Sequence, residues 1–396
     1  MTNAPAVACM NVKFSPNLGD GLLSECLEQA LIAAGADPGT RSVDLAGRST
    51  YGDAMAMRGT ALAVLDALPG PVRRQAVRLP LRLQSMRKWG PHYDRELDAM
   101  GATAMVIGGG NLIADLDLNF PTKLDLAMRH AAARALPVVI FGCGMGSSFT
   151  DEGLRRLLRA FSRPNLRAVF LRDAASVATW DRLIGAKTGL MAQVVRDPGL
   201  LSATAHPAPP RSARDTPVIG LGLMSHVAIR YHSKAQVTEV GLRAWYLDVA
   251  RALRAAGAQV RAFTNGSPED VATAEQMRAD LLAMDVPLDR PTTPTELSTL
   301  VADCDAIAAY RMHAVIAAYS HGVPALALAW DAKVASFMAS VGRDDWLADP
   351  ATLPADAAAR RIMTAAEEGL DMDVHATVLA EAQADVARAF AVLQSA

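Results

Sequence analysis

The sequence predicts an α/β protein with two doubly wound domains, each a parallel sheet covered by helices on both faces. Short apolar runs alternate with longer amphipathic stretches along nearly the whole chain, a pattern typical of repeated β-α units. The alternation stops once, in a proline-rich stretch at residues 206–217, and then starts again. Because 396 residues are too many for one ordinary core, we expect two domains joined by this linker.

The predicted elements of the first half follow this alternation. Residues 7–12 form an apolar strand, and residues 21–34 have the amphipathic pattern of the next helix. Further strands are predicted at residues 104–107, 138–141, 167–171 and 194–195, with helices at 151–161 and 174–184.

The second half repeats the pattern. Its strands are predicted at residues 218–223, 259–263, 306–309 and 325–329, and its helices at 238–256, 268–284, 313–321 and 333–341. The expected division is an N-terminal domain at 1–205, the linker at 206–217 and a C-terminal domain at 218–345. The helices of residues 346–396 are expected to pack back onto the first domain.

Composition excludes several classes of protein. The 51% of hydrophobic and 20% of charged residues are typical of a globular protein, and the net charge of -2 argues against a general nucleic-acid binder. No apolar run approaches the roughly 20 residues that span a bilayer, and residues 1–12 do not resemble a signal peptide, so we expect a cytoplasmic protein. The eight histidines lack metal-binding spacings, and no CxxC pair occurs among the cysteines, which are Cys9, Cys26, Cys143 and Cys304.

Four basic side chains follow predicted strands, where doubly wound sheets bind their ligands. Arg172 follows one strand of the first domain. Arg311 and His313 follow a strand of the second domain, and Lys333 lies in the first turn of a later helix. A cation at a helix N-terminus opposes the helix dipole, so an anionic partner is expected there. The alternatives are a solvated surface residue or a local ion pair, but the repeated placement favours a site for a small ligand with two anionic groups.

Two glycine runs and one polar turn also follow predicted strands. The runs are residues 108–110, followed by Asn111, and residues 142–146. Glycine allows a backbone to approach a ligand closely, but neither run matches a nucleotide-binding fingerprint, and tight turns are an equal alternative. Asn17 and Asp20 follow the first strand, where they would bind a ligand or simply cap the next helix.

Other candidates carry less weight. Asp115 and Asp117 have the spacing of a metal–nucleotide motif, but a solvated turn is the simpler interpretation. Cys143 lies in the second glycine run, and a small buried residue is favoured over an activated thiol.

Residues 72–89 form a basic amphipathic stretch with six cations and no acid. Large apolar residues, Trp89 among them, alternate with the basic ones. Such a stretch suits an anionic membrane surface or a lipid-phosphate acceptor, with a solvated irregular insertion as the alternative.

These segments together resemble the polysaccharide pyruvyltransferase family. The Arg-x-His start of a helix with a downstream Gly-x-Pro and Lys is the most specific part, and the glycine runs are the least specific. The matching segments are NLGD (17–20), VIGGGN (106–111), GCGMG (142–146), LRDAAS (171–176), RDPGLL (196–201), RMHAVIAAYSHGVP (311–324) and WDAK (330–333).

The resemblance implies the GT-B-like arrangement of two Rossmann-like domains that face a cleft. It implies a cytoplasmic enzyme of exopolysaccharide synthesis for the bacterial cell envelope. This enzyme would use phosphoenolpyruvate to form a pyruvate ketal on two sugar hydroxyls, without a metal or organic cofactor. Phosphoenolpyruvate contacts would fall to Arg172, Arg311, His313 and Lys333, with His313 as general acid and Lys333 as the next candidate. On the first-domain side, the acceptor would contact Asn17, Asp20, Gly109, Gly110 and Asn111.

Two other functions remain open. A nucleotide-sugar glycosyltransferase would share the fold, but a ribose-binding glutamate is missing from the predicted strand ends. A solute-binding protein of the periplasmic type also has two α/β domains, and the lack of a leader argues against it.

Overall fold

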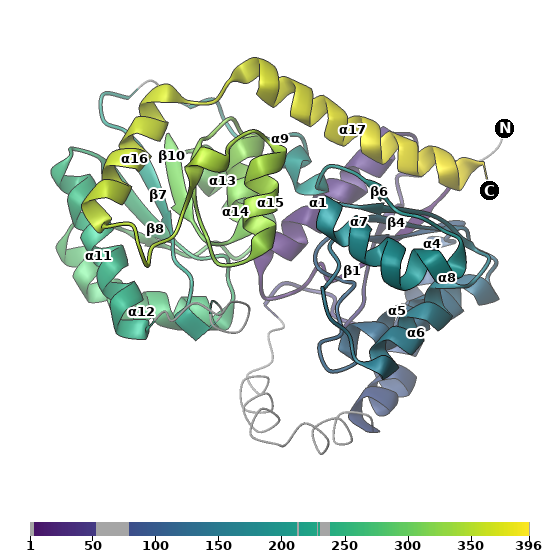
Figure 1. The fold of residues 1–396 in the computed structure, drawn as a ribbon. Coiled ribbons are helices and arrows are strands. Elements are labelled where there is room, and N and C mark those ends of the chain that lie inside the picture. The colour runs from purple at the N-terminus through teal and green to yellow at the C-terminus, as the bar shows by residue number, and fades with distance from the viewer. Residues whose placement is uncertain (1–3, 53–78, 212–213, 228, 230–237, 396) are drawn as a thin grey trace. The chain divides into compact units, whose positions relative to one another are not determined.

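The computed structural model describes residues 4–52, 79–211, 214–227, 229 and 238–395 (Figure 1). The chain divides into two compact units, and neither is a continuous stretch of sequence. Unit 1 comprises Met1–Ser15, Leu23–Pro198 and Ala382–Ala396, and unit 2 comprises Pro16–Leu22 and Gly199–Glu381.

Unit 1 is built around one parallel sheet. Its strands are β1 (Val7–Asn11), β2 (Arg41–Asp44), β3 (Ala104–Gly108), β4 (Val138–Cys143), β5 (Leu166–Leu171) and β6 (Gln193–Val194). The helices of this part of the chain are α1 (Leu18–Ala33), the π-turn η1 (Ser85–Trp89), α4 (Gly90–Met100), α5 (Asn119–Ala133), α6 (Asp151–Phe161), α7 (Ala174–Trp180), the π-turn η2 (Asp181–Gly185) and α8 (Ala186–Thr188).

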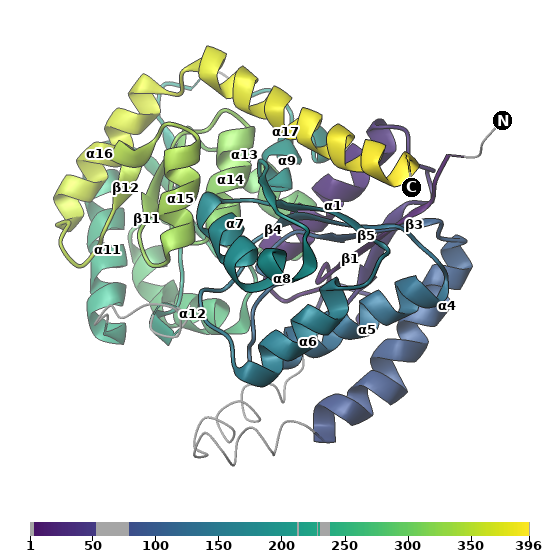
Figure 2. The same ribbon diagram turned by 45° about the vertical axis from the view of Figure 1, so that its right-hand side comes forward.

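The strand order in unit 1 is β2-β1-β3-β4-β5-β6, so the order reverses between β1 and β3. Every residue of β1, β3 and β4 is buried, as expected when helices cover both faces of a parallel sheet. Figure 2 shows α4, α5 and α6 side by side on one face of this sheet. This topology is that of a doubly wound Rossmann-like domain.

Unit 2 repeats the architecture with a second six-stranded parallel sheet. Its strands are β7 (Val218–Gly222), β8 (Gln259–Phe263), β9 (Leu288–Asp289), β10 (Ala306–Ala309), β11 (Ala325–Leu328) and β12 (Leu347–Ala348). The helices described in the rest of the chain are α9 (Ser202–Ala205), preceded by the 3-10 turn η3 (Pro198–Leu201), then α11 (Glu239–Ala255), α12 (Pro268–Ala283), α13 (Pro294–Ala302), α14 (Met312–Ser320), α15 (Ala332–Ser340), the 3-10 turn η4 (Asp344–Trp346), α16 (Ala355–Glu368) and α17 (Met372–Gln394). The last part of α17, from Ala382 onward, belongs to unit 1.

The strand order in unit 2 is β12-β11-β10-β7-β8-β9, which reverses between β10 and β7. A ligand is expected at the carboxyl ends of these two central strands, because the connections leave the sheet there in opposite directions. The helix α16 packs against α11 and completes the cover of one face (Figure 1).

The boundaries of the units differ from the predicted domain boundaries. The predicted linker at 206–217 and the residues just before it belong to unit 2. Hydrogen bonds join this stretch to α13: the buried Ser202 Oγ lies 2.9 Å from Ser298 Oγ, and His206 Nδ1 lies 3.0 Å from Thr295 Oγ1. A first boundary therefore lies at Pro198 rather than at residue 205.

The C-terminal helices also divide differently from the prediction. Residues 346–381 belong to unit 2, and only Ala382–Ala396 belongs to unit 1. In unit 1, the Arg196 N–H donates to Asp385 Oδ2 at 2.7 Å, and the Arg388 guanidinium lies 5.0 Å from the centre of the Phe170 ring.

The basic stretch at 72–89 is described only from residue 79 onward, and residues 72–78 lie outside the described residues. Residues 79–84 are helical and continue through η1 into α4. Leu79 and Met86 are 64% and 56% exposed, whereas Trp89 is buried and the Lys123 ammonium lies 4.8 Å from the centre of its ring. The amphipathic pattern predicts that Trp89 contributes to a membrane-facing surface, and this expectation is wrong, because the ring belongs to the core of unit 1.

Two further observations concern the described part of the chain alone. No helix in it is long and apolar enough to cross a membrane. Its histidine, cysteine, aspartate and glutamate side chains form no group of three that would hold a metal ion.

Candidate functional site

Arg172 lies directly after β5 in unit 1, as the sequence predicts. Its N–H donates to the Cys143 carbonyl at 3.2 Å, and its side chain is only 5% exposed. The next residue, Asp173, caps α7 by accepting the Ser176 N–H at 2.7 Å. The Arg172 guanidinium pairs with a buried carboxylate, because Nη1 lies 3.4 Å from Asp197 Oδ2. The carboxyl ends of β5 and β6 therefore place a cation and its counter-charge together.

The glycine run after β4 makes room for this guanidinium. A Cβ atom on Gly144 would lie 2.9 Å from Arg172 Nη2 and 3.0 Å from Asn111 Oδ1. A side chain at this position would displace one of the two groups. The Asn111 amide and the Arg172 guanidinium thus converge on one glycine at the ends of β3, β4 and β5.

The backbone conformation itself requires glycine in the first glycine run. Gly109 and Gly110 have φ values of +81° and +68°, which favour glycine. A Cβ on Gly109 would lie 2.7 Å from a methyl carbon of Leu23, and the Gly110 carbonyl accepts the Gly144 N–H at 2.8 Å. These contacts account for both glycines by the turn itself, so their contact with an acceptor stays a prediction.

Cys143 is buried beside this cluster. Burial raises the pKa of its thiol to about 12, although the nearby Arg172 charge opposes the shift. The thiol is therefore protonated at neutral pH, and the interpretation of Cys143 as a small buried residue is confirmed.

Arg311 follows β10 in unit 2 and occupies the N-cap position of α14. Its Nε donates to Asp270 Oδ2 at 2.8 Å, and its Nη2 lies 2.7 Å from the same oxygen. Asp270 is fully buried in the first turn of α12, and its other oxygen accepts the Ser225 N–H at 2.9 Å. Because both contacts use one edge of the guanidinium, Arg311 is fixed in direction while its Nη1 group lies outside the pair.

His313 lies in the first turn of α14 and is 7% exposed. The first turn of α1, which belongs to unit 2, lies against its imidazole. A Cβ on Gly19 would be 2.8 Å from His313 Nδ1 and 2.7 Å from His313 Cβ. The N-terminus of α14, which contains His313, thus packs directly against the N-terminus of α1 in the same unit.

Lys333 lies in the first turn of α15, where Asp331 is the cap. The Asp331 carboxylate accepts the Lys333 N–H at 3.1 Å, and its second oxygen lies 3.1 Å from Lys333 Nζ. The lysine side chain is 27% exposed and is the most accessible of the predicted cations of unit 2. Its ammonium is available to a ligand that displaces the neighbouring carboxylate.

Asn17 and Asp20 lie at the start of α1. Asn17 Oδ1 accepts the Gly19 N–H at 3.3 Å, and the Asn17 carbonyl accepts the Asp20 N–H at 3.0 Å, so Asn17 has the role of a helix cap. Both residues belong to unit 2, although the sequence places them in the first domain. The predicted residues thus form two groups: one around Arg172 with Asn111 in unit 1, and one around His313 with Arg311 in unit 2.

A family model for polysaccharide pyruvyl transferases matches residues 17–332. The chain belongs to this family. The match spans the matching segments at the start of α1, after β3, β4, β5 and β10, and most of the WDAK segment. The predicted family is therefore confirmed. Among curated proteins, no sequence matches the chain.

Solved structures resemble this pyruvyl transferase in fold. One is a putative UDP-N-acetylglucosamine 2-epimerase from Listeria monocytogenes, with 11% identity, a TM-score of 0.53 and coverage of 99% of this chain and 96% of that one. Another is the UDP-N-acetylglucosamine 2-epimerase from Rickettsia bellii, with 11% identity, a TM-score of 0.52 and the same coverage. At this identity the likeness concerns the fold alone, and the predicted GT-B-like class with two Rossmann-like domains is confirmed.

Sequence reasoning missed the acidic partners of the two arginines of this pyruvyl transferase. Asp197 lies within the RDPGLL segment, which contributes to the family resemblance, and its position after β6 was the available signal. Asp270 resembles an ordinary acid in the first turn of a helix, where the dipole favours it. Burial raises the pKa of Asp270, and the Arg311 charge opposes the shift. Only the folded structure shows that its partner is the arginine after β10.

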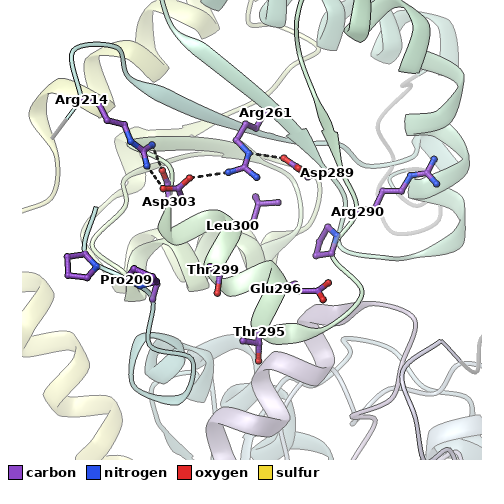
Figure 3. Close-up of a pocket in the computed structure, with 13 residues that line it drawn as sticks. Pro209, Arg214, Arg261, Asp289, Arg290, Thr295, Glu296, Thr299, Leu300 and Asp303 are labelled. Atoms are coloured by element: carbon purple, nitrogen blue, oxygen red, sulfur yellow. Dashed lines mark hydrogen bonds and ion pairs between the residues drawn. The ribbon is translucent and has the colours of Figure 1, made fainter. Parts of the chain in front are cut away.

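A cavity of about 550 Å³ lies elsewhere in unit 2, along α13 (Figure 3). Four of its charged side chains pair with one another. Arg261 lies between Asp289 and Asp303 at 2.8 and 3.1 Å, and Arg214 pairs with Asp303. The predicted site residues do not line it, and its paired charges do not point to a particular ligand.

Proposed function

We propose that this pyruvyl transferase uses phosphoenolpyruvate to form a pyruvate ketal on two hydroxyls of a saccharide. The observation that carries the proposal is the placement of Arg311 at the N-cap of α14, and of His313 and Lys333 in the first turns of α14 and α15, after adjacent strands of unit 2. Phosphoenolpyruvate has a carboxylate and a phosphate, with roughly two to three negative charges at neutral pH. Cations beside helix N-termini suit such a ligand, because backbone N–H groups add hydrogen-bond donors.

The proposed binding roles follow from the contacts of each cation. Arg311 offers its Nη1 group in a direction fixed by Asp270. The Lys333 ammonium, which pairs with Asp331 in the structure, would bind an oxygen of the ligand in place of that carboxylate. Arg172, the cation of unit 1, is proposed to bind the second anionic group of the donor, in keeping with its segment of the family match.

The proposed reaction begins with a proton transfer from the protonated imidazole of His313 to the methylene carbon of phosphoenolpyruvate. This carbon becomes a methyl group, and positive character develops on the neighbouring carbon that bears the phosphate ester. One acceptor hydroxyl adds there and loses its proton. The second hydroxyl then displaces the phosphate group and loses its proton to it, which closes the ketal and releases inorganic phosphate. A positioned acid of this kind contributes about 10²–10⁴-fold to the rate.

The acceptor is proposed to be a sugar of a polysaccharide precursor. Asn17 and Asp20 lie in the turn that contacts His313, so a hydroxyl held by them would be near the proposed acid. Asn111 is the proposed acceptor contact in unit 1, together with the backbone of Gly109 and Gly110. The reaction as written uses no cofactor.

Contact with an anionic membrane is a further part of the proposal. The exposed residues Leu79, Arg82, Met86, Arg87 and Lys88 place apolar and basic side chains on the described part of the basic stretch. No acid occurs between residues 79 and 93. A lipid-linked saccharide at the inner membrane face would offer an apolar chain to the apolar side chains and phosphate groups to the basic ones.

Product analysis tests the reaction. Purified enzyme, phosphoenolpyruvate and a panel of glycosides are incubated, and mass spectrometry follows the gain of a pyruvate ketal while phosphate release is measured in parallel. Thermal shift with phosphoenolpyruvate and with UDP separates this function from the nucleotide-sugar alternative, since a ligand at 100 times its Kd stabilises by about 2.7 kcal/mol. Stabilisation by UDP alone, without a ketal product, would overturn the proposal.

A further inference from the structure

The contact between Gly19 and His313 is closer than a side chain would allow. A Cβ on Gly19 would lie 2.7 Å from His313 Cβ, 2.8 Å from Nδ1 and 3.1 Å from Cγ. The φ of Gly19 is outside the left-handed region, so its backbone does not require glycine. Glycine is also an unfavourable residue in a helix. The space taken by the imidazole is thus the reason for glycine at this position.

A rotation of the histidine side chain would not relieve the clash. The nearest atom is the Cβ of His313, which does not move when χ1 changes. Its place is set by the backbone of α14, whose first turn begins at Met312. A side chain at residue 19 would therefore shift either the start of α14 or the turn that contains Gly19.

The turn that contains Gly19 is itself anchored in unit 2. The Leu18 N–H donates to the carbonyl of the buried Asn265 at 2.8 Å. The next residue, Gly266, has a φ of +85°, and a Cβ on it would lie 2.8 Å from the Pro16 carbonyl oxygen. The start of α1 is thus held against the loop after β8, and it bears on His313 from a fixed position.

We propose that Gly19 is a positioning residue for His313. The inference rests on the proposed function for the role of His313 as an acid, and on the geometry alone for the position of its ring. A proton donor must lie close to the carbon that it protonates, and a displacement of about 1 Å can reduce a rate by about 10²-fold. Gly19 then sets the distance from the imidazole to the donor carbon without touching the substrate.

The test is the variant Gly19→Ala. We expect kcat to fall at least tenfold, while the Kd for phosphoenolpyruvate, measured by calorimetry, changes less than threefold. NMR of the protein labelled at its histidine rings gives a second readout, with the His313 signal assigned by its loss in His313→Gln. That signal should shift in Gly19→Ala, and it should stay in place in the control Gly146→Ala, where a Cβ has at least 3.7 Å to its neighbours. Unchanged kcat together with an unmoved His313 signal would overturn the proposal.

A double variant keeps the proposal testable if Gly19→Ala folds poorly. In the His313→Gly background the clashing Cβ is gone, so Gly19→Ala should lower the melting temperature much less than it does in the wild type. An equal loss in both backgrounds would show that Gly19 does not serve this contact. If the wild type forms no ketal, the proposed function fails, and the ring signals and the double variant still decide whether Gly19 positions His313.

Discussion

The carboxylate of Asp270 binds the Nε–Nη2 edge of Arg311, with both nitrogens within 2.8 Å of the same oxygen. The second oxygen accepts the Ser225 N–H, so one buried carboxylate joins the ends of β7 and β10 to α12. A carboxylate with no exposed surface requires this compensation, because burial of an unpaired charge is costly. Arg311 is therefore a preoriented group rather than a mobile surface cation.

Removal of this counter-charge should affect both stability and donor binding. We expect Asp270→Asn to lower the free energy of unfolding by about 3 kcal/mol and to raise the KM for phosphoenolpyruvate, because Arg311 loses its partner. Denaturant unfolding and steady-state kinetics measure the two effects. Glu269→Gln is the matched control. Glu269 lies 3.5 Å from Arg311 but is 44% exposed, so the free energy of unfolding of this variant should stay within about 0.5 kcal/mol of the wild type. Equal stability of both variants would contradict the importance of the pair.

Loss of a donor-binding cation should weaken binding while the protein stays folded. Lys333→Ala is the cleanest case, since Lys333 is partly exposed and its ammonium pairs with the cap of its own helix. Each charge-assisted hydrogen bond is worth about 1.5–3 kcal/mol, so we expect a rise in the Kd for phosphoenolpyruvate of roughly 10- to 150-fold. The same direction is expected for Arg172→Ala. Calorimetric titration checks both, and unchanged affinities would remove these residues from the donor site.

His313→Gln should separate turnover from binding. Glutamine still donates a hydrogen bond but does not release a proton at neutral pH, so the loss should be in kcat, by about 10²–10⁴-fold. The Kd for phosphoenolpyruvate should change far less. A variant with a kcat close to that of the wild type would transfer the acid role to another group, with Lys333 the next candidate.

The buried His321 should make the stability of the protein depend on pH. Burial lowers the pKa of His321 to about 4, helped by the nearby charges of His206 and Arg211, and its Nε2 lies 2.8 Å from Ser298 Oγ. Since this pKa is below the unfolded value of about 6.5, stability is complete above pH 6.5 and is lost as the pH falls towards 4. The loss approaches about 1.4 kcal/mol per pH unit within this window. Urea unfolding between pH 7 and 4 should give a shallower slope for His321→Gln, and identical slopes would refute the assignment.

The membrane proposal has a direct test. Wild type should co-sediment with vesicles that contain anionic lipid at low salt and not with neutral vesicles. The variant with Arg82, Arg87 and Lys88 changed to glutamine should bind the anionic vesicles less, because each cation near such a surface adds about 1 kcal/mol of attraction. Equal binding of wild type and variant would mean that these side chains are an ordinary solvated surface.

The central strands were predictable because their apolar runs are buried on both faces. Residues 138–141 and 306–309 are examples, and both are strands in the structure. The edge strands β2, β9 and β12 were not predicted, because each includes partly buried residues and none forms a continuous apolar run. The burial of Trp89 was also not predicted. A π-turn at Ser85–Trp89 changes the helical register there, which a pattern with the period of an α-helix does not anticipate.

The cations of the site were predictable because they follow strands directly. Their partners were not, because Asp197 and Asp270 are distant in sequence from the arginines that they bind. The same limit applies to Gly19, which the sequence presents as part of a helix start, whereas its contact with His313 joins residues almost three hundred positions apart. Sequence spacing identifies which side chains lie at a strand end, but long-range packing decides how each is held.

The division of the chain affects how the protein is made on the ribosome. Unit 1 includes Ala382–Ala396, which follow all of unit 2 in the sequence, and unit 2 includes Pro16–Leu22, which precede most of unit 1. The first unit is therefore still incomplete when the second has almost wholly emerged. The turn at Pro16–Leu22 can pack only after the loop that follows β8 and the start of α14 have been made. A fragment cut at the proline-rich stretch would lack a native part in either half, so separate expression of the two halves should give two unstable products rather than two independent domains.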